Sequence, residues 1–157
     1  MKKILIVLAL FVGSLFVMGG GCEFETSTSF GLTAEDSVLA KFEGGSWQQA
    51  PDSTFQRGDD IALILLNVRG FEKGDDGLNK MDIDVEVEGP EGEIIFKEDG
   101  MLGEEGHVNL ENNVANSPYG SFSSTEGLEP GRYIIKVTVR DEIGEGSTTK
   151  RKTFTLE

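Results

Sequence analysis

Residues 82–97, DIDVEVEGPEGEIIFK, decide the fold because they have the pattern of a β-hairpin. From Asp82 to Glu88, acidic and apolar residues alternate strictly, which gives a strand one charged face and one apolar face. Gly89 to Gly92 supplies the glycines and proline of a turn, and residues 93–97 return as the next strand. The stretch therefore predicts an antiparallel pair of strands.

Short strand patterns separated by glycine and proline turns lie on both sides of this hairpin. Residues 60–68 (DIALILLNV) are apolar on both faces, which is typical of a central, covered strand. In 132–140 (RYIIKVTVR), every second residue from Tyr133 to Val139 is expected to face inward. Further strands are expected at 37–42, 107–110, 120–124 and 150–156. Helical periodicity is not sustained, so the sequence predicts an all-β, antiparallel immunoglobulin-like β-sandwich of about seven strands.

The N-terminus has the organisation of an export signal. Two lysines precede the segment 4–18, which is apolar but shorter than the roughly 20 residues of a transmembrane helix. Gly20, Gly21 and Cys22 then resemble the lipobox of bacterial lipoproteins, in which small residues precede a cysteine; position 19 is glycine where leucine is common. The resemblance implies cleavage before Cys22 and acylation of its thiol. The alternative is an ordinary signal peptide followed by an incidental cysteine.

The sequence thus predicts three parts: a signal peptide at 1–21, the acylated Cys22 with a polar tether over 22–36, and a sandwich domain over 37–157. Residues 23–33 are rich in serine and threonine, as suits a tether. We expect an exported protein, anchored through Cys22 to the cell membrane or outer membrane, with its domain on the periplasmic or extracellular side.

Charge limits the partners of the chain. Its 157 residues include 14 Lys and Arg against 28 Asp and Glu, for a formal net charge of −14. Such a surface repels phosphate, which argues against nucleic-acid binding and against electrostatic attachment to anionic lipids. The basic run 150–152 is expected to lie near acidic surface.

The order of strands and turns resembles the immunoglobulin-like and fibronectin-III-like domains of bacterial surface proteins. Phe55–Asp59 leads into a buried strand, Val87–Glu93 joins two strands, and the Pro-Gly-Arg-Tyr of 130–133 opens a long late strand. The resemblance covers residues 37–157 and implies a fold without implying an activity, because such folds host many functions.

Few residues are arranged for catalysis. His107 is the single histidine and no G-x-S-x-G elbow occurs, so a surface histidine is the favoured interpretation. Asp82 and Asp84 could form a hydrolase acid pair, but their place on one exposed strand face favours a solvated surface. We therefore predict a non-catalytic binding or structural module of the cell envelope; the sequence does not identify its partner, for which an envelope protein is the candidate. Two alternatives stay open: an envelope assembly or chaperone subunit that presents an edge strand, and a carboxylate-based secreted hydrolase.

Trp47 and Tyr119 form the candidate binding rim. Trp47 lies in a Gly/Gln/Pro segment, where it either anchors a partner or plugs one end of the sandwich; the plug is the preferred interpretation. Tyr119 lies in the polar segment 111–121, which we expect to be a loop.

Residues 72–84 are a candidate calcium site, with Asp75, Asp76, Asn79 and Asp82 as the oxygen donors. The segment lacks the spacing of an EF-hand, and two lysines accompany the acids. The favoured alternative is a solvated Asp/Gly turn that needs no cofactor.

Overall fold

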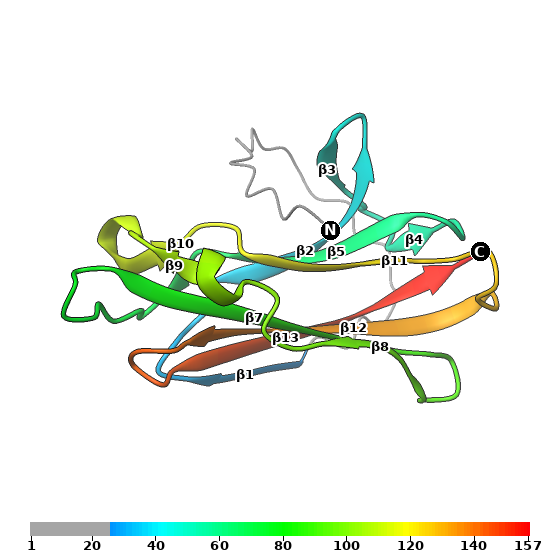
Figure 1. Ribbon diagram of the computed structural model, residues 1–157. Helices are drawn as coiled ribbons and strands as arrows, with labels where there is room; N and C mark the ends of the chain where they lie inside the picture. Colours follow the sequence, from blue (N-terminus) through cyan, green and yellow to red (C-terminus); the bar gives the residue numbers. More distant parts are fainter. Residues whose placement is uncertain (1–25) are drawn as a thin grey trace.

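The computed structural model describes residues 26–157, which form a β-sandwich of two mainly antiparallel sheets packed face to face (Figure 1). This part of the chain contains no α-helix, only the short 3₁₀ turns η1 (Gly103–Gly106) and η2 (Glu111–Asn113). Within residues 26–157, no helix is long and apolar enough to cross a membrane. The predicted fold class is confirmed.

The larger sheet has the strand order β1-β13-β12-β7-β8. Its strands are β1 (Thr26–Phe30), β13 (Ser147–Leu156), β12 (Gly131–Asp141), β7 (Asn79–Glu88) and β8 (Ile94–Glu98). Two short strands are added to it: β4 (Thr54–Phe55) pairs in parallel with β13, and β9 (His107–Val108) pairs with β7. The hairpin predicted at 82–97 is therefore the β7–β8 pair at one side of this sheet.

The smaller sheet has the order β11-β5-β2-β3. Its strands are β11 (Tyr119–Ser123), β5 (Asp60–Leu66), β2 (Asp36–Glu43) and β3 (Ser46–Gln49). A separate ladder joins β6 (Val68–Arg69) to β10 (Val114–Ala115). The strand predicted at 60–68 is interrupted at Asn67, whose φ of 50° lies in the left-handed region.

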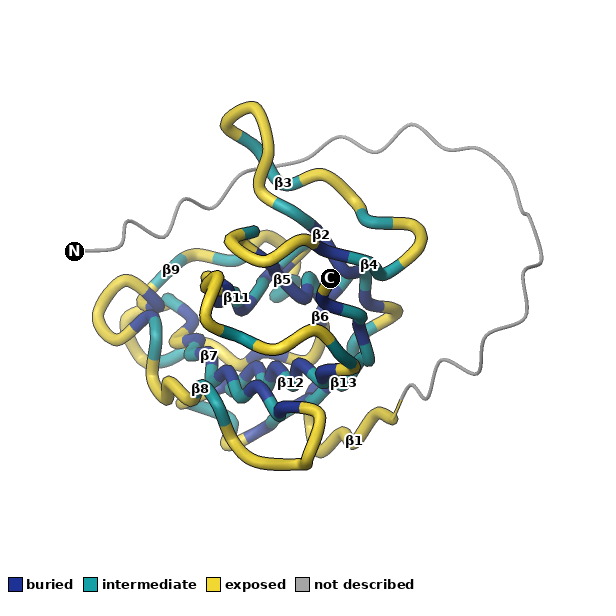
Figure 2. The backbone as a smooth tube through the Cα atoms, turned by 90° about the vertical axis from the view of Figure 1, so that its right-hand side faces the viewer, coloured by how far each residue is buried: buried dark blue, intermediate teal, exposed yellow. Residues whose placement is uncertain are grey.

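The core lies between the sheets, where alternate residues of each long strand meet (Figure 2). All inward residues predicted for β7 and β12 are buried, from Ile83 at 3% exposure to Val137 at 0%. From the other sheet, Ile61, Leu63 and Leu65 of β5 are each 0% exposed. Burial of these large side chains supplies the main driving force for folding.

Tyr133 shows how the late strand is held in place. Its hydroxyl donates a hydrogen bond to the backbone oxygen of Glu129 at 2.6 Å, and its ring stacks on Phe154 at a centroid distance of 5.5 Å. Burial raises the pKa of Tyr133 above its ordinary value. A tyrosine bonded to the backbone just upstream of its strand is also a feature of immunoglobulin-type sandwiches.

The sandwich begins earlier in the chain than the boundary expected at residue 37. β1 pairs with β13 over its whole length, and Leu32, just beyond β1, is 0% exposed in the core. Residues 26–36 therefore belong to the folded domain and do not form part of a tether. The signal peptide and Cys22 lie outside the described residues.

Candidate functional site

The outer face of the smaller sheet is unusually apolar. In β5, the residues that alternate with the core positions include Ala62 and Ile64, which consequently point outward. Ala40 of β2 pairs with Ala62 in register and shares this face. Ala40 and Ala62 are nevertheless 1% and 0% exposed, so larger side chains cover them from outside the sandwich.

Three aromatic side chains, Phe42, Trp47 and Tyr119, form a cluster on this outer face, which we name the aromatic patch. The ring centroids of Phe42 and Trp47 are 5.3 Å apart, and those of Trp47 and Tyr119 are 5.4 Å apart. β3 and β11 are the opposite edges of the sheet, separated by β5 and β2. Because neighbouring strands lie about 4.8 Å apart, the β2–β3 hairpin must bend over the sheet for Trp47 to reach Tyr119.

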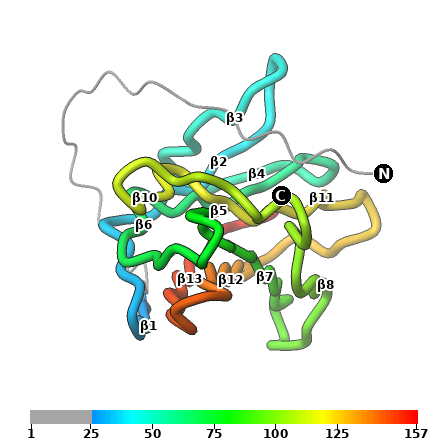
Figure 3. Tube along the Cα trace, turned by 60° about the vertical axis from the view of Figure 1, so that its left-hand side comes forward, coloured from blue at the N-terminus to red at the C-terminus, as the bar shows by residue number. Residues whose placement is uncertain are grey.

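The aromatic patch is accessible. The β2–β3 hairpin rises from the side of the sandwich that faces away from the larger sheet (Figure 3). Phe42 is 43% exposed, while Trp47 and Tyr119 are half-buried. The ring planes meet at 68° and 61°, so the cluster is a ridge of edges and faces and does not form a flat platform.

The structure thus brings together the two residues of the predicted rim. The preferred interpretation of Trp47 as a plug is wrong, because its ring packs on the outer face against Phe42 and Tyr119 and is absent from the buried core. Phe42 was missed by the sequence analysis. The sequence of β5 contained an indication that such a residue exists. A strand that is apolar on both faces, in a sandwich of only two layers, needs apolar side chains to cover its outer face as well.

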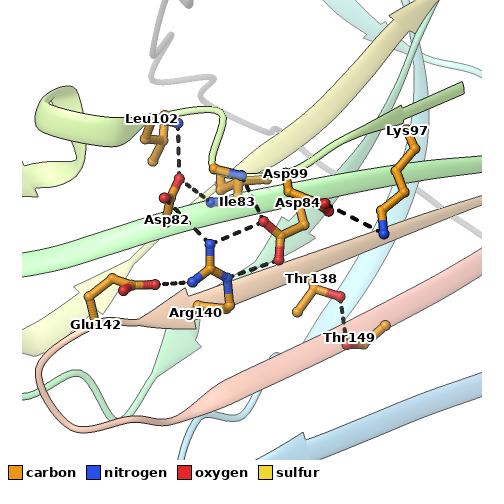
Figure 4. Close-up of polar contacts among 11 residues, drawn as sticks. Asp82, Ile83, Asp84, Lys97, Asp99, Leu102, Thr138, Arg140, Glu142 and Thr149 are labelled. Carbon is orange, nitrogen blue, oxygen red and sulfur yellow. Dashed lines mark hydrogen bonds and ion pairs between the residues drawn. The ribbon is translucent and has the colours of Figure 1, made fainter.

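The acid pair Asp82 and Asp84 is occupied by an arginine on the outer face of the larger sheet (Figure 4). Arg140 donates to both oxygens of Asp84, at 2.9 and 3.1 Å, and also contacts Asp82 and Glu142. These contacts, with the Asp84 hydrogen bonds foremost, raise the pKa of Arg140. Asp82 in addition accepts the backbone N–H of Leu102 at 3.0 Å. The two acids lie on one strand face and bind one cation, so the arrangement gives no support to the hydrolase alternative.

The basic run on β13 reaches acidic surface as expected at one position. Arg151 Nη2 lies 2.6 Å from Glu88 Oε2, on the neighbouring part of the larger sheet. β12 lies between β13 and β7, so this ion pair reaches across an intervening strand.

Three of the four predicted calcium donors, Asn79, Asp82 and Asp76, make hydrogen bonds or ion pairs within the protein. Asn79 is 0% exposed; its amide donates to the carbonyl of Glu72 at 2.9 Å and accepts the backbone N–H of Leu110 at 3.0 Å. Asp82 is bound to Arg140, as described above. Asp75 is exposed.

Asp76 closes the turn that precedes β7. It accepts the backbone N–H of Leu78 at 3.0 Å, which is the main reason that its pKa lies below the ordinary value. His107 adds to this lowering through its Nε2, 2.8 Å from the Asp76 carboxylate. In the described part of the chain, no three His, Cys, Asp or Glu side chains are grouped so that they could hold a metal ion. Calcium binding at this loop stays a prediction.

The fold places the chain among the immunoglobulin-like β-sandwiches. No protein-family model and no curated protein sequence matches it. Among solved structures, it is similar to the C-terminal domain of wzt, with a TM-score of 0.53 and 12% identity over 87% of this chain and 78% of that one. It is also similar to a Niemann-Pick type C2 protein from the Japanese carpenter ant, with a TM-score of 0.51 and 10% identity over 83% of this chain and 96% of that one. Similarity at this level of identity shows the fold alone.

Proposed function

We propose that this chain is a lipid-anchored cell-envelope protein whose β-sandwich is a non-catalytic binding module, with the aromatic patch as its contact surface for an envelope protein. The observation that carries the proposal is the contact of Trp47 with Tyr119 and Phe42 on an open face. Tryptophan and tyrosine are over-represented among the residues that dominate protein interfaces.

The shape of the patch favours a protein partner over a sugar. Aromatic rings at 61° and 68° to each other leave pockets and edges between them, into which partner side chains can pack. A stacked sugar would instead need an open, level ring face. Gln48 and Gln49 lie beside Trp47 on β3 and provide amide donors and acceptors for the polar rim of an interface.

The lipid anchor in this proposal rests on the resemblance of Gly20-Gly21-Cys22 to a lipobox. Only three residues, 23–25, separate Cys22 from the start of β1, which limits the span to about 14 Å when fully extended. The sandwich would therefore lie close to the lipid surface. β1 and the β2–β3 hairpin lie on opposite sides of the sandwich, so the aromatic patch would face away from the attachment point (Figure 1).

Photo-crosslinking in cells tests the binding surface. A benzoyl-phenylalanine at Phe42 should give a discrete crosslinked protein that disappears with Trp47→Ala. The control position is Ile94, which is 58% exposed on β8 of the other sheet and should give no such product. Equal products from both positions, or none from Phe42, would remove the patch as the contact surface.

Mass spectrometry of the membrane-extracted protein tests the anchor separately. The mature chain should begin at Cys22 and carry the mass of a diacylglycerol. The Cys22→Ser variant should be released in soluble form. An unmodified cysteine, or a mature chain that begins elsewhere, contradicts lipidation without bearing on the patch.

A second candidate function, assembly through an edge strand, is favoured by β1. All five of its residues are exposed, none is charged, and Phe30 at its end is 73% exposed. Uncharged, exposed edge strands are templates for pairing with another chain. If this candidate is correct, Thr28→Lys should abolish capture of the partner, whereas Trp47→Ala should leave it intact.

A further inference from the structure

An apolar cavity lies between the two sheets, at the end of the sandwich bounded by β9, β10 and the start of β11. Its volume is about 270 Å³. The inner wall is formed by buried apolar side chains, among them Met81, Ile83, Leu102 and Ala115. The cavity adjoins the aromatic patch and shares Tyr119 with it, but neither Phe42 nor Trp47 lines the cavity.

The two sheets approach each other closely on one side of the cavity. Gly120 of β11 lies against Val85 of β7, where a Cβ atom would come within 2.1 Å of the valine. One step further toward the beginning of β7, Ile83 and Met81 line the cavity. There the facing wall comes from residues 108–119, in which only the short strand β10 and the turn η2 lie between the end of β9 and the start of β11.

The polar residues of the cavity are at its mouth. Asn109, Glu111 and Asn116 line it and are exposed, while the half-buried Val108, Leu110 and Val114 continue the apolar wall. An apolar interior with a few polar groups at the opening is the usual form of a small-molecule site.

The size and lining of the cavity define the chemistry of its guest. An apolar cavity of about 150 Å³ remains dry and accepts benzene, so this larger cavity has room for a longer hydrocarbon. Among the lining residues, no lysine, arginine or histidine is present, and Glu111 is the one charged side chain. Lys73 lies outside the lining but donates to Asn109 Oδ1 at 2.8 Å, which places one cation near Glu111 at the mouth. The net charge of −14 nevertheless gives the chain as a whole a negative potential that disfavours a carboxylate or phosphate.

We propose that this cavity binds a small, uncharged amphiphile, with its hydrocarbon part between the sheets and its polar end at the rim formed by Asn109, Glu111 and Asn116. Negatively charged counterparts of the same size bind more weakly. The proposal rests on the cavity alone and does not depend on the proposed function of the aromatic patch.

Two fluorescent probes with one ring skeleton test the size and charge requirements on the full mature chain. N-phenyl-1-naphthylamine is uncharged, and 1-anilinonaphthalene-8-sulfonate carries an added sulfonate. The uncharged probe should bind saturably, at least tenfold more tightly than the sulfonate, and decanol should displace it more effectively than decanoate. Absence of saturable binding, or equal affinity for both probes, overturns the proposal.

Substitutions locate the binding site. Val114→Phe should fill the cavity and weaken probe binding at least tenfold, whereas Ile94→Phe, at an exposed position on β8, should leave binding unchanged. Equal loss in both variants, or in neither, places the probe elsewhere and contradicts the proposal.

If Val114→Phe does not fold, reversal of the charge at Glu111 provides a second test of the proposal. Glu111→Lys should shift the preference toward decanoate about threefold relative to decanol, a size typical of one exposed charge. Glu91→Lys makes the same change in net charge on the β7–β8 turn, away from the cavity, and should not alter the preference. An identical effect of both reversals would show that net charge, and not the cavity mouth, selects the ligand.

The chain carries its own reporter for guests that do not fluoresce. Tyr119 lines the cavity and contacts Trp47, the only tryptophan of the chain. Saturation with decanol should therefore change the Trp47 emission, and Val114→Phe should suppress the change. An emission that does not respond to decanol under conditions where the probe is displaced would contradict the assigned position.

Discussion

The contact between the two sheets at Gly120 makes a sharp prediction about stability. Gly120 is buried in β11, and its φ lies outside the left-handed region, so alanine meets no backbone obstacle there. The obstacle is steric: the new Cβ would lie 2.1 Å from Val85 Cγ2 and 2.8 Å from Val137 Cγ2. Both valines are almost completely buried, at 1% and 0% exposure, and a β-branched side chain has little freedom to move aside.

The magnitude follows from the packing. Overpacking of a core by one methyl group costs about 1–3 kcal/mol, so we expect Gly120→Ala to lower the free energy of unfolding by about 2 kcal/mol. Val85→Ala removes two methyl groups, at about 0.8 kcal/mol each plus a cavity term, for a loss of about 2 kcal/mol. In the double variant, the alanine at 120 occupies the space that Val85 Cγ2 leaves, but its close contact with Val137 Cγ2 at 2.8 Å remains. The loss should be about 3 kcal/mol instead of about 4, a coupling of about 1 kcal/mol.

Equilibrium urea denaturation of the mature chain, followed by circular dichroism, measures all four corners of this cycle. Gly127→Ala is the matched control, because the nearest atom to its Cβ would be Thr125 Oγ1 at 3.8 Å, and it should be neutral or slightly stabilising. If Gly120→Ala is also neutral, or if the two losses simply add, then the sheets do not make a close contact at this point beside the cavity.

Three further predictions concern the ends and loops of the sandwich. Tyr133→Phe should cost about 1 kcal/mol in urea denaturation, because the hydrogen bond to Glu129 is lost while ring packing is kept; an unchanged midpoint would show that this bond does not stabilise the fold. A chain that begins at residue 37 should be less stable than one that begins at residue 23 by about 3 kcal/mol or more, because it lacks β1 and the buried Leu32; equal stability would restore the later boundary. Calcium and magnesium at equal millimolar concentration should raise the thermal midpoint alike if residues 72–84 are only a turn, whereas a larger effect of calcium that Asp75→Asn with Asp76→Asn removes would establish the calcium site.

The long strands could be predicted because each has one face in the core and one in water. Burial of alternate residues leaves a period of two in the sequence, which is unmistakable in β7 and β12. The turn at Gly89–Gly92 could also be predicted, because the backbone conformation of a turn restricts which residue types it accepts. Gly92, for example, has a φ of 84°, which glycine adopts readily.

The strand β1 could not be predicted by the same reasoning. It lies at the edge of the larger sheet, all five residues are exposed, and its Ser/Thr sequence therefore carries no trace of an apolar face. It pairs with β13, more than a hundred residues away in the chain, mainly through backbone hydrogen bonds that most side chains permit, with one side-chain hydrogen bond between the Ser29 and Thr148 hydroxyls at 2.9 Å. A polar edge strand and a polar tether look alike until the register with the partner strand is known.

The aromatic patch is an intermediate case, and it shows what a sequence can say about a site. Phe42 and Trp47 are cross-strand partners within one hairpin, but Tyr119 is brought to them by the order of four strands, which local patterns do not contain. What the sequence does contain is a discrepancy in β5. Its outward residues Ala62 and Ile64 are apolar, although a two-layer sandwich has no third layer to cover them. Either such a face is covered by a neighbouring segment of the chain or it is covered by a partner. Here Ala62 is 0% exposed and Phe42 is 43% exposed, so the chain covers only part of the face, and the exposed remainder is the surface that we assign to the partner.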